Sequence, residues 1–156
     1  MTSADKQEGY RRVEEGIGAY LEECTKGVDA MATLVAFLKE QLGHILWVGF
    51  YLAEEDGSLR VGPYQGPPAT PLLPAGKGVC GAAFRSGETL IVPDVHAFPG
   101  HIACDCRSKS EIVLPFRSKG RLVGVLDVDS ALPAAFDETD RLHLEGLLRR
   151  ISGPRG

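Results

Sequence analysis

The sequence lacks three features that would each define a class of protein. No segment has the unbroken apolar length that a bilayer-crossing helix needs. Residues 1–9 lack the basic start and apolar centre of a secretory signal peptide. Positive charge is not in excess, because 17 Lys and Arg residues stand against 21 Asp and Glu residues. We therefore expect a cytoplasmic protein with no membrane attachment and no nucleic-acid partner, which would require a basic face.

Length and composition predict one globular domain over residues 1–156. A chain of this size, with 44% hydrophobic and 24% charged residues, can bury one core but not two comfortable ones. Four cysteines could form two disulfides in a secreted protein, but a cytosolic chain of this size needs none. Reactive thiols are the better interpretation of these cysteines.

Amphipathic periodicity predicts helices at both ends of the chain. Two helices are expected over about 5–43 and a third over about 137–152, with Asp137 as its N-cap. Cys24 falls on the apolar stripe of the first helix, so it is interpreted as a small buried hydrophobic residue.

The intervening part, residues 44–130, is rich in β-branched and aromatic runs. The pairs Asp56-Gly57 and Lys119-Gly120 indicate two hairpin turns, and a short helix is expected at 78–87. Five prolines and four glycines within residues 62–78 exclude regular structure over much of its length, so an ordered loop or a flap is expected. This order of elements predicts an α+β fold, an antiparallel sheet flanked by helices.

Thiols and carboxylates are predicted to meet in one pocket. Cys104 lies in a long polar loop that ends at Glu111, and long loops in compact domains are often functional. Asp127 and Asp129 point to the same face of their strand because side chains alternate. Cys80 is expected near the start of the short helix, where unpaired backbone N–H groups lower a thiol pKa.

Three kinds of chemistry could use this cluster. His96, His101, Cys104 and Cys106 could ligate zinc, but Cys-x-Cys in an extended loop aims its sulfurs poorly at one tetrahedral ion. A Cys–His hydrolase with Cys104 as nucleophile and His101 or His96 as base would need an oxyanion hole, which the sequence does not specify. A redox thiol fits better, because grouped carboxylates retain a proton that could be given to a departing oxygen.

Six motifs stand out along the chain: Trp47–Tyr51, Gly76–Gly81, Asp94–His96, Phe98–Asp105, Ser110–Pro115 and Gly124–Ser130. Together they closely resemble the free methionine-(R)-sulfoxide reductases, which are stand-alone GAF-domain enzymes. The resemblance runs from about Tyr10 to Leu148. The resemblance implies a GAF-type antiparallel sheet and thiol-dependent reduction of free L-methionine-(R)-S-oxide to L-methionine.

The resemblance also assigns the thiols. Cys104 matches the family's nucleophile, which attacks the sulfoxide sulfur, releases methionine and is left as a sulfenic acid. Cys80 matches a cysteine that resolves the sulfenic acid as a disulfide, later reduced by thioredoxin. It further implies a homodimer and no metal or organic cofactor, with the first helix as a candidate for the dimer contact.

The substrate-binding residues come from the same resemblance. Glu111, Asp127 and Asp129 match carboxylates that hydrogen-bond the sulfoxide oxygen, donate a proton or hold the substrate ammonium group. Trp47 and Tyr51 match the aromatic wall that packs the substrate's methyl end. The resemblance implies substrate-binding roles for Trp47, Tyr51, Ile102, Ala103, Glu111, Asp127 and Asp129.

Two positions depart from the family pattern. Thr70 stands where many members have another cysteine, and Cys106 is an additional thiol. A disulfide between Cys104 and Cys106 would be strained, because their Cβ atoms diverge in an extended segment. Cys80 is therefore the expected resolving residue.

The competing hypothesis is a GAF sensory module that binds a small ligand without turnover.

Overall fold

The computed structural model describes residues 1–100 and 107–153 of the chain. Its elements follow in order. They are α1 (Ser3–Glu23), α2 (Gly27–Gln41), β1 (Trp47–Ala53), β2 (Leu59–Gln65), β3 (Leu72–Leu73), α3 (Gly78–Ser86), β4 (Leu90–Val92), the 3-10 turn η1 (Val95–Ala97), β5 (Ser110–Ser118), β6 (Arg121–Ser130) and α4 (Glu138–Ile151).

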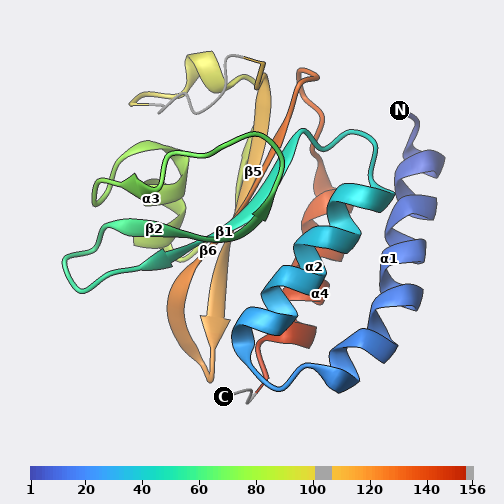
Figure 1. Ribbon diagram of the computed structural model, residues 1–156. Coiled ribbons are helices and arrows are strands. Elements are labelled where there is room, and N and C mark those ends of the chain that lie inside the picture. The colour runs from blue at the N-terminus through green and yellow to red at the C-terminus, as the bar shows by residue number, and fades with distance from the viewer. Residues whose placement is uncertain (101–106, 154–156) are drawn as a thin grey trace.

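The six strands form one antiparallel sheet in the order β3-β2-β1-β6-β5-β4. Helices α1, α2 and α4 cover one face, and α3 lies on the other (Figure 1). The helical face holds the larger core, in which residues such as Tyr10, Leu38 and Leu126 are fully buried. A smaller core, which includes Val79 and Val113, lies between α3 and the sheet. The α+β fold predicted from the sequence is confirmed.

The segment 62–78, which was predicted to be irregular over much of its length, contains the end of one strand and the whole of another. Strand β2 continues to Gln65, and β3 pairs with it through Leu72 and Leu73. The register between β1 and β2 shifts between Gly49 and Tyr51, opposite Pro63. Proline has no N–H group to give to a ladder, so it is tolerated at such a bulge.

The second predicted hairpin forms as expected, between β5 and β6. Its two turn residues, Lys119 and Gly120, have φ values of 53° and 78°. Positive φ at both positions matches a type I′ turn, whose twist suits the flanking strands. This turn, together with a register shift between Phe116 and Arg117, places Glu111 of β5 opposite Asp129 of β6.

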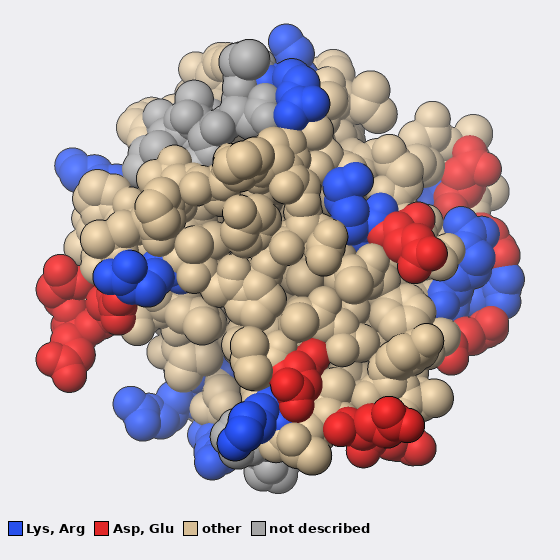
Figure 2. All heavy atoms as spheres, viewed as in Figure 1, with Lys and Arg blue, Asp and Glu red and all other residues tan. Residues whose placement is uncertain are grey.

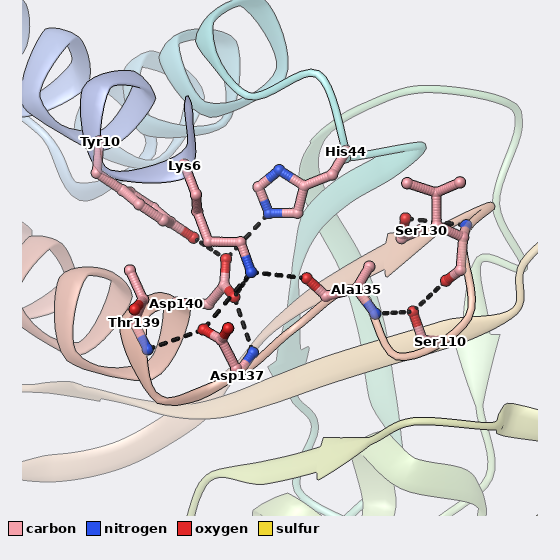
Figure 3. A network of polar contacts seen from close by, with 10 residues as sticks. Lys6, Tyr10, His44, Ser110, Ser130, Ala135, Asp137, Thr139 and Asp140 are labelled. Atoms are coloured by element: carbon pink, nitrogen blue, oxygen red, sulfur yellow. Dashed lines mark hydrogen bonds and ion pairs between the residues drawn. The ribbon is translucent and has the colours of Figure 1, made fainter. Parts of the chain in front are cut away.

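A buried carboxylate, Asp140, ties the helical layer to the loop that follows the sheet (Figure 3). Its oxygens accept hydrogen bonds from Lys6 Nζ at 2.7 Å, Tyr10 Oη at 2.7 Å, His44 Nε2 at 3.0 Å and the Asp137 backbone N–H at 2.8 Å. These donors hold the pKa of Asp140 at about 2, below its usual value, although burial acts in the opposite direction. The contacts fix the N-terminus of α4 against α1.

The same network reaches the strands that carry the carboxylates. Lys6 Nζ also donates to the Ala135 carbonyl at 2.9 Å, and the Ala135 N–H donates to Ser110 Oγ at 3.1 Å. Ser110 directly precedes Glu111 on β5. The start of β5 is therefore anchored from behind by the helical layer (Figure 3).

The charges on the face drawn in Figure 2 are mixed in sign. Lys and Arg side chains alternate there with Asp and Glu side chains, and a broad uncharged area lies between the groups. Among residues 1–100 and 107–153, no helix combines the length and the apolar character needed to cross a membrane.

Candidate active site

A cavity opens on the face of the sheet that carries α3. Its empty volume is about 570 Å³ when the open solvent at its mouth is included. Its lining is apolar on the walls and polar at one side. The lining residues are Leu46, Trp47, Pro67, Pro68, Leu73, Lys77, Gly78, Val79, Cys80, Ser108, Glu111, Asp127 and Asp129.

Strand register brings the three predicted carboxylates together in this cavity. Glu111 on β5 pairs with Asp129 on the neighbouring β6, and Asp127 lies two residues before Asp129 on the same face. Glu111 and Asp127 are each only 5% exposed, and Asp129 is half-buried. Three acidic groups therefore share a space that is largely closed to water.

Burial and proximity change the protonation of this group. The pKa of Glu111 is raised well above its usual value, first by burial and then by the charges of Asp127 and Asp129. The pKa of Asp127 is raised by burial, and hydrogen bonds from Glu111 and Cys80 act against this shift. Glu111 is thus the carboxyl group for which the protonated form is most favoured, and it donates a hydrogen bond to Asp127.

Cys80, the third residue of α3, also lines the cavity. Its thiol donates a hydrogen bond to Asp127, and its pKa is raised well above the usual value, first by burial and then by the charges of Asp127 and Glu111. The prediction that the helix N-terminus lowers this pKa is wrong. Burial and neighbouring carboxylates outweigh the partial positive charge of the first helical turn.

Cys80, Glu111 and Asp127 could also ligate a metal ion. One ligand atom from each lies within 4.8 Å of the other two. A metal would require the thiol and both carboxyl groups to be deprotonated. In the metal-free protein the raised pKa values of Cys80 and Glu111 favour the protonated forms.

Trp47 forms the aromatic wall of the cavity. It stacks on Tyr64 and Tyr51, with ring centroids 5.3 Å and 5.9 Å away. Gly49 makes this packing possible, because a Cβ atom there would lie 2.4 Å from Tyr64 Cβ and 2.5 Å from the Trp47 ring. The Trp47 indole donates to the Pro67 carbonyl at 3.1 Å. The wall is thereby fastened to the segment that follows β2.

Tyr51, the second aromatic residue predicted at the site, is not among the residues that line the cavity. It is 1% exposed and lies behind Trp47, and its hydroxyl donates to the Thr70 carbonyl at 2.9 Å. Trp47 and Tyr51 together fasten residues 66–71, which we call the flap. The flap contributes Pro67 and Pro68 to the cavity wall.

Several predicted residues lie outside the described part of the chain. They are His101, Ile102, Ala103, Cys104 and Cys106. The description resumes at Arg107, and Ser108 lines the cavity. Ser108 and Lys77 were not predicted as site residues, because neither belongs to a hydrophobic period. The only signal for them was their position within or beside the six family motifs.

A six-stranded antiparallel sheet with a ligand-sized cavity on one face defines the GAF class of domains. The profile of the GAF domain family matches residues 28–153 of this chain. Within that class, the chain belongs to the free methionine-R-sulfoxide reductase family, as its motifs predicted. It is 40% identical over 147 residues to the free methionine-R-sulfoxide reductase of Escherichia coli, covering 94% of this chain and 88% of that protein.

Two further relatives support this family assignment. The free methionine-R-sulfoxide reductase of Saccharomyces cerevisiae is 48% identical over 111 residues, covering 69% of this chain and 62% of the yeast protein. The structure of the Neisseria meningitidis free methionine-R-sulfoxide reductase in complex with its substrate superposes with a TM-score of 0.86 at 46% identity. That match covers 92% of this chain and 86% of the Neisseria chain. This chain is therefore an oxidoreductase of the methionine sulfoxide reductase type.

Proposed function

We propose that this chain reduces free L-methionine-(R)-S-oxide to L-methionine by thiol chemistry in the cavity beside α3. The observation that carries the mechanism is the buried carboxyl group of Glu111, which retains a proton and faces the cavity together with Asp127. A sulfoxide oxygen needs a proton before it can leave sulfur. A carboxylic acid kept neutral by its surroundings can supply one.

In the first step the Cys104 thiolate attacks the sulfoxide sulfur, and Glu111 protonates the sulfoxide oxygen. The sulfur–oxygen bond breaks, the oxygen passes to Cys104 as a sulfenic acid, and methionine leaves as the thioether. The substrate gains two electrons and the Cys104 sulfur loses two. Glu111 regains its proton from the thiol proton that the nucleophile gave up.

In the second step Cys80 resolves the sulfenic acid. Its sulfur attacks the Cys104 sulfur, a disulfide forms and water leaves, with Asp127 accepting the Cys80 proton and passing it to the departing hydroxide. The hydrogen bond from Cys80 to Asp127 supports this route for the proton. Thioredoxin then reduces the disulfide, and the cycle needs no metal or organic cofactor.

Substrate binding follows from the two sides of the cavity. The methyl and methylene groups pack against Trp47, Leu46 and the flap prolines, which are the apolar part of the lining. The ammonium group binds Asp127 and Asp129, with Ile102 and Ala103 completing the site. Tyr51 acts indirectly, by supporting Trp47 and holding the flap through Thr70.

The proposed assembly is a cytoplasmic homodimer. The reducing cytoplasm keeps thiols available to thioredoxin. Helix α1 is a candidate for the contact, because its outer face exposes Tyr20, which is 60% accessible in the single chain. Sedimentation of the wild-type protein and Tyr20→Glu tests this assembly. A wild-type protein that sediments as a monomer rejects it.

The proposed function is tested by methionine release from the two free sulfoxide epimers, with dithiothreitol or thioredoxin as reductant. Cys104→Ser is expected to abolish release with either reductant. Cys80→Ser is expected to lose only the thioredoxin-driven turnover, because dithiothreitol reduces a sulfenic acid directly. Cys24→Ser, at the C-cap of α1 and outside the cavity, is the matched control. A wild-type protein that binds the sulfoxide without releasing methionine would instead be a sensory module.

A further inference from the structure

One oxygen atom of Asp127 is buried at the cavity without a partner from the protein. Asp127 is 5% exposed and lines the cavity beside α3. Its Oδ1 atom has no hydrogen-bond partner within residues 1–100 and 107–153, although Glu111 and Cys80 donate to this carboxyl group. Buried carboxylate oxygens are nearly always paired. This atom therefore indicates a cation or a hydrogen-bond donor that comes from outside the chain.

Two further ligand atoms lie beside it. The Cys80 sulfur, one Glu111 oxygen and one Asp127 oxygen all lie within 4.8 Å of one another. Each comes from a different element, since Cys80 is on α3, Glu111 on β5 and Asp127 on β6. Bond lengths of about 2.0–2.3 Å place the ligand atoms of a tetrahedral zinc ion roughly 3.5 Å apart. Small rotations of these side chains are therefore enough to bring the three atoms to one ion.

The types of ligand select the metal. A thiolate is a soft ligand that suits zinc, whereas magnesium and calcium prefer oxygen ligands alone. Three protein ligands leave the fourth tetrahedral position open to the cavity, where water completes the coordination. Lys77 is the one basic residue among those that line the cavity, and it is exposed, so water and salt screen its charge.

The crowding of acidic groups that favours protons here also favours a dication. Burial and neighbouring charges raise the pKa values of Cys80 and Glu111, so protons occupy these groups in the metal-free protein. A bound dication reverses this effect, and a thiol that coordinates a metal is deprotonated. The two protons pass to solvent when the metal binds. The half-buried Asp129 adds further negative charge at the same cavity.

We propose that Cys80, Glu111 and Asp127 form an inhibitory zinc site that is open only while the protein is reduced. The zinc is not a cofactor, because it occupies the thiol and the carboxylates that the two catalytic steps use. The binding site stands on the geometry above, whereas the inhibition rests on the proposed function. A disulfide between Cys80 and Cys104 removes the thiolate, so the oxidised protein is expected to release the metal.

Binding is tested in a protein with a single thiol. A triple variant, Cys24→Ser with Cys104→Ser and Cys106→Ser, leaves Cys80 as the last of the four cysteines. Cadmium, a spectroscopic substitute for zinc, is expected to produce a thiolate–cadmium charge-transfer absorption that zinc removes by competition. Adding Cys80→Ser is expected to abolish this absorption. Magnesium is expected to leave it unchanged, because it does not compete for a thiolate.

The carboxylate ligand is tested in the same background. Asp127→Asn is expected to raise Kd for zinc by more than about tenfold, because even groups that only orient a ligand contribute roughly 10–100-fold to affinity. Asp56→Asn, at an exposed aspartate outside the cavity, is the matched control and is expected to keep the Kd of its background. If the triple variant does not fold, calorimetric Kd values for zinc in wild type, Cys80→Ser and Cys104→Ser replace it. The large increase is then expected in Cys80→Ser.

Inhibition is measured in a single turnover of pre-reduced protein, without added thiols that would bind zinc. Zinc is expected to suppress methionine release from free methionine-(R)-sulfoxide, and a chelator is expected to restore it. The first turnover of Cys80→Ser uses Cys104, and its half-inhibiting zinc concentration is expected to be more than about tenfold higher than in wild type. Oxidation of zinc-loaded wild type by excess sulfoxide is expected to release the metal to a colorimetric chelator.

The site is overturned if Cys80 gives no charge-transfer absorption or if Asp127→Asn keeps the Kd of its background. Equal zinc inhibition of wild type and Cys80→Ser would place the metal at another thiol, and zinc binding without inhibition would overturn the inhibitory role. A failure of the proposed function looks different, because wild type then releases no methionine with or without zinc. The cadmium absorption and the zinc Kd values still decide the binding site in that case.

Discussion

Glu111 on β5 donates a hydrogen bond to Asp127 on β6, within a cavity that excludes most water. Two carboxyl groups in this relationship cannot both be ionised at low cost. The shared proton is therefore built into the free protein. It is available to a sulfoxide oxygen without a separate step of proton uptake.

Glu111→Gln is expected to lower the rate of methionine release by roughly 10²–10⁴-fold, the usual contribution of a positioned general acid. The amide can still donate a hydrogen bond but cannot transfer a proton, so Kd for the sulfoxide is expected to change far less than the rate. Single-turnover release measures the chemical step. Glu88→Gln, an exposed glutamate outside the cavity, is the control. An unchanged single-turnover rate in Glu111→Gln would assign the proton to another group.

The same substitution is expected to stabilise the protein at neutral pH. Glu111 has a raised pKa in the folded state, so the folded protein keeps a proton that the unfolded chain releases. The contribution of Glu111 to the free energy of unfolding is fully present below about pH 4.3, the pKa of glutamate in an unfolded chain. It is lost as the pH rises toward the higher pKa of Glu111 in the folded protein. Glu111→Gln removes that loss. Urea unfolding at pH 4 and pH 8 is expected to show a smaller decrease with pH in Glu111→Gln than in wild type, and an equal decrease would contradict this account.

Asp140→Asn is expected to destabilise the fold by about 3–5 kcal/mol, because the buried Lys6 ammonium loses its nearer carboxylate and keeps only Asp137 at 3.5 Å. The pKa of Asp140 is lowered to about 2, so the wild type gains stability above the unfolded pKa and loses it as pH falls from about 5 to 2. That contribution is about 2 kcal/mol. Denaturant unfolding between pH 7 and pH 3 measures it. If wild type and Asp140→Asn lose the same stability on acidification, Asp140 is not the source of the loss.

Tyr51→Phe is expected to loosen the flap. It removes the hydroxyl that donates to the Thr70 carbonyl at 2.9 Å but keeps the ring behind Trp47. The expected cost is about 1 kcal/mol of stability, the usual worth of one hydrogen bond. Hydrogen exchange should become faster in residues 66–71, and KM should rise with little change in kcat. Exchange that accelerates over the whole sheet instead would show that the hydroxyl supports the fold and not the flap.

Short-range signals in the sequence predicted most of the framework. The helices α1, α2 and α4 have apolar stripes that can be read without knowing what they pack against. Asp137 accepts from the Thr139 N–H as a helix N-cap, as expected. Strand β3 was missed because a two-residue strand pairs with β2 across the flap, and such long-range pairing leaves no local period.

In the candidate site, too, local patterns predicted some features and missed others. Alternation along β6 predicted that Asp127 and Asp129 share a face, and the family motifs singled out Glu111. Two features depend on neighbours that are distant in the chain. One is the burial of the Ser108 hydroxyl, and the other is the hydrogen bond by which Tyr51 supports the flap. No pattern within one segment indicates them.

The sequence by itself determined the α+β class, the kinds of residue at the site and the family, because periodicity, turn residues and motifs are local properties. Tertiary structure alone decided the protonation of the site. Cys80 lies at a helix start, where local reasoning lowers the thiol pKa, yet the fold buries it against Asp127 and Glu111 and raises the pKa. Electrostatic energies depend on distance and burial in space, and neither quantity is encoded in a single stretch of chain.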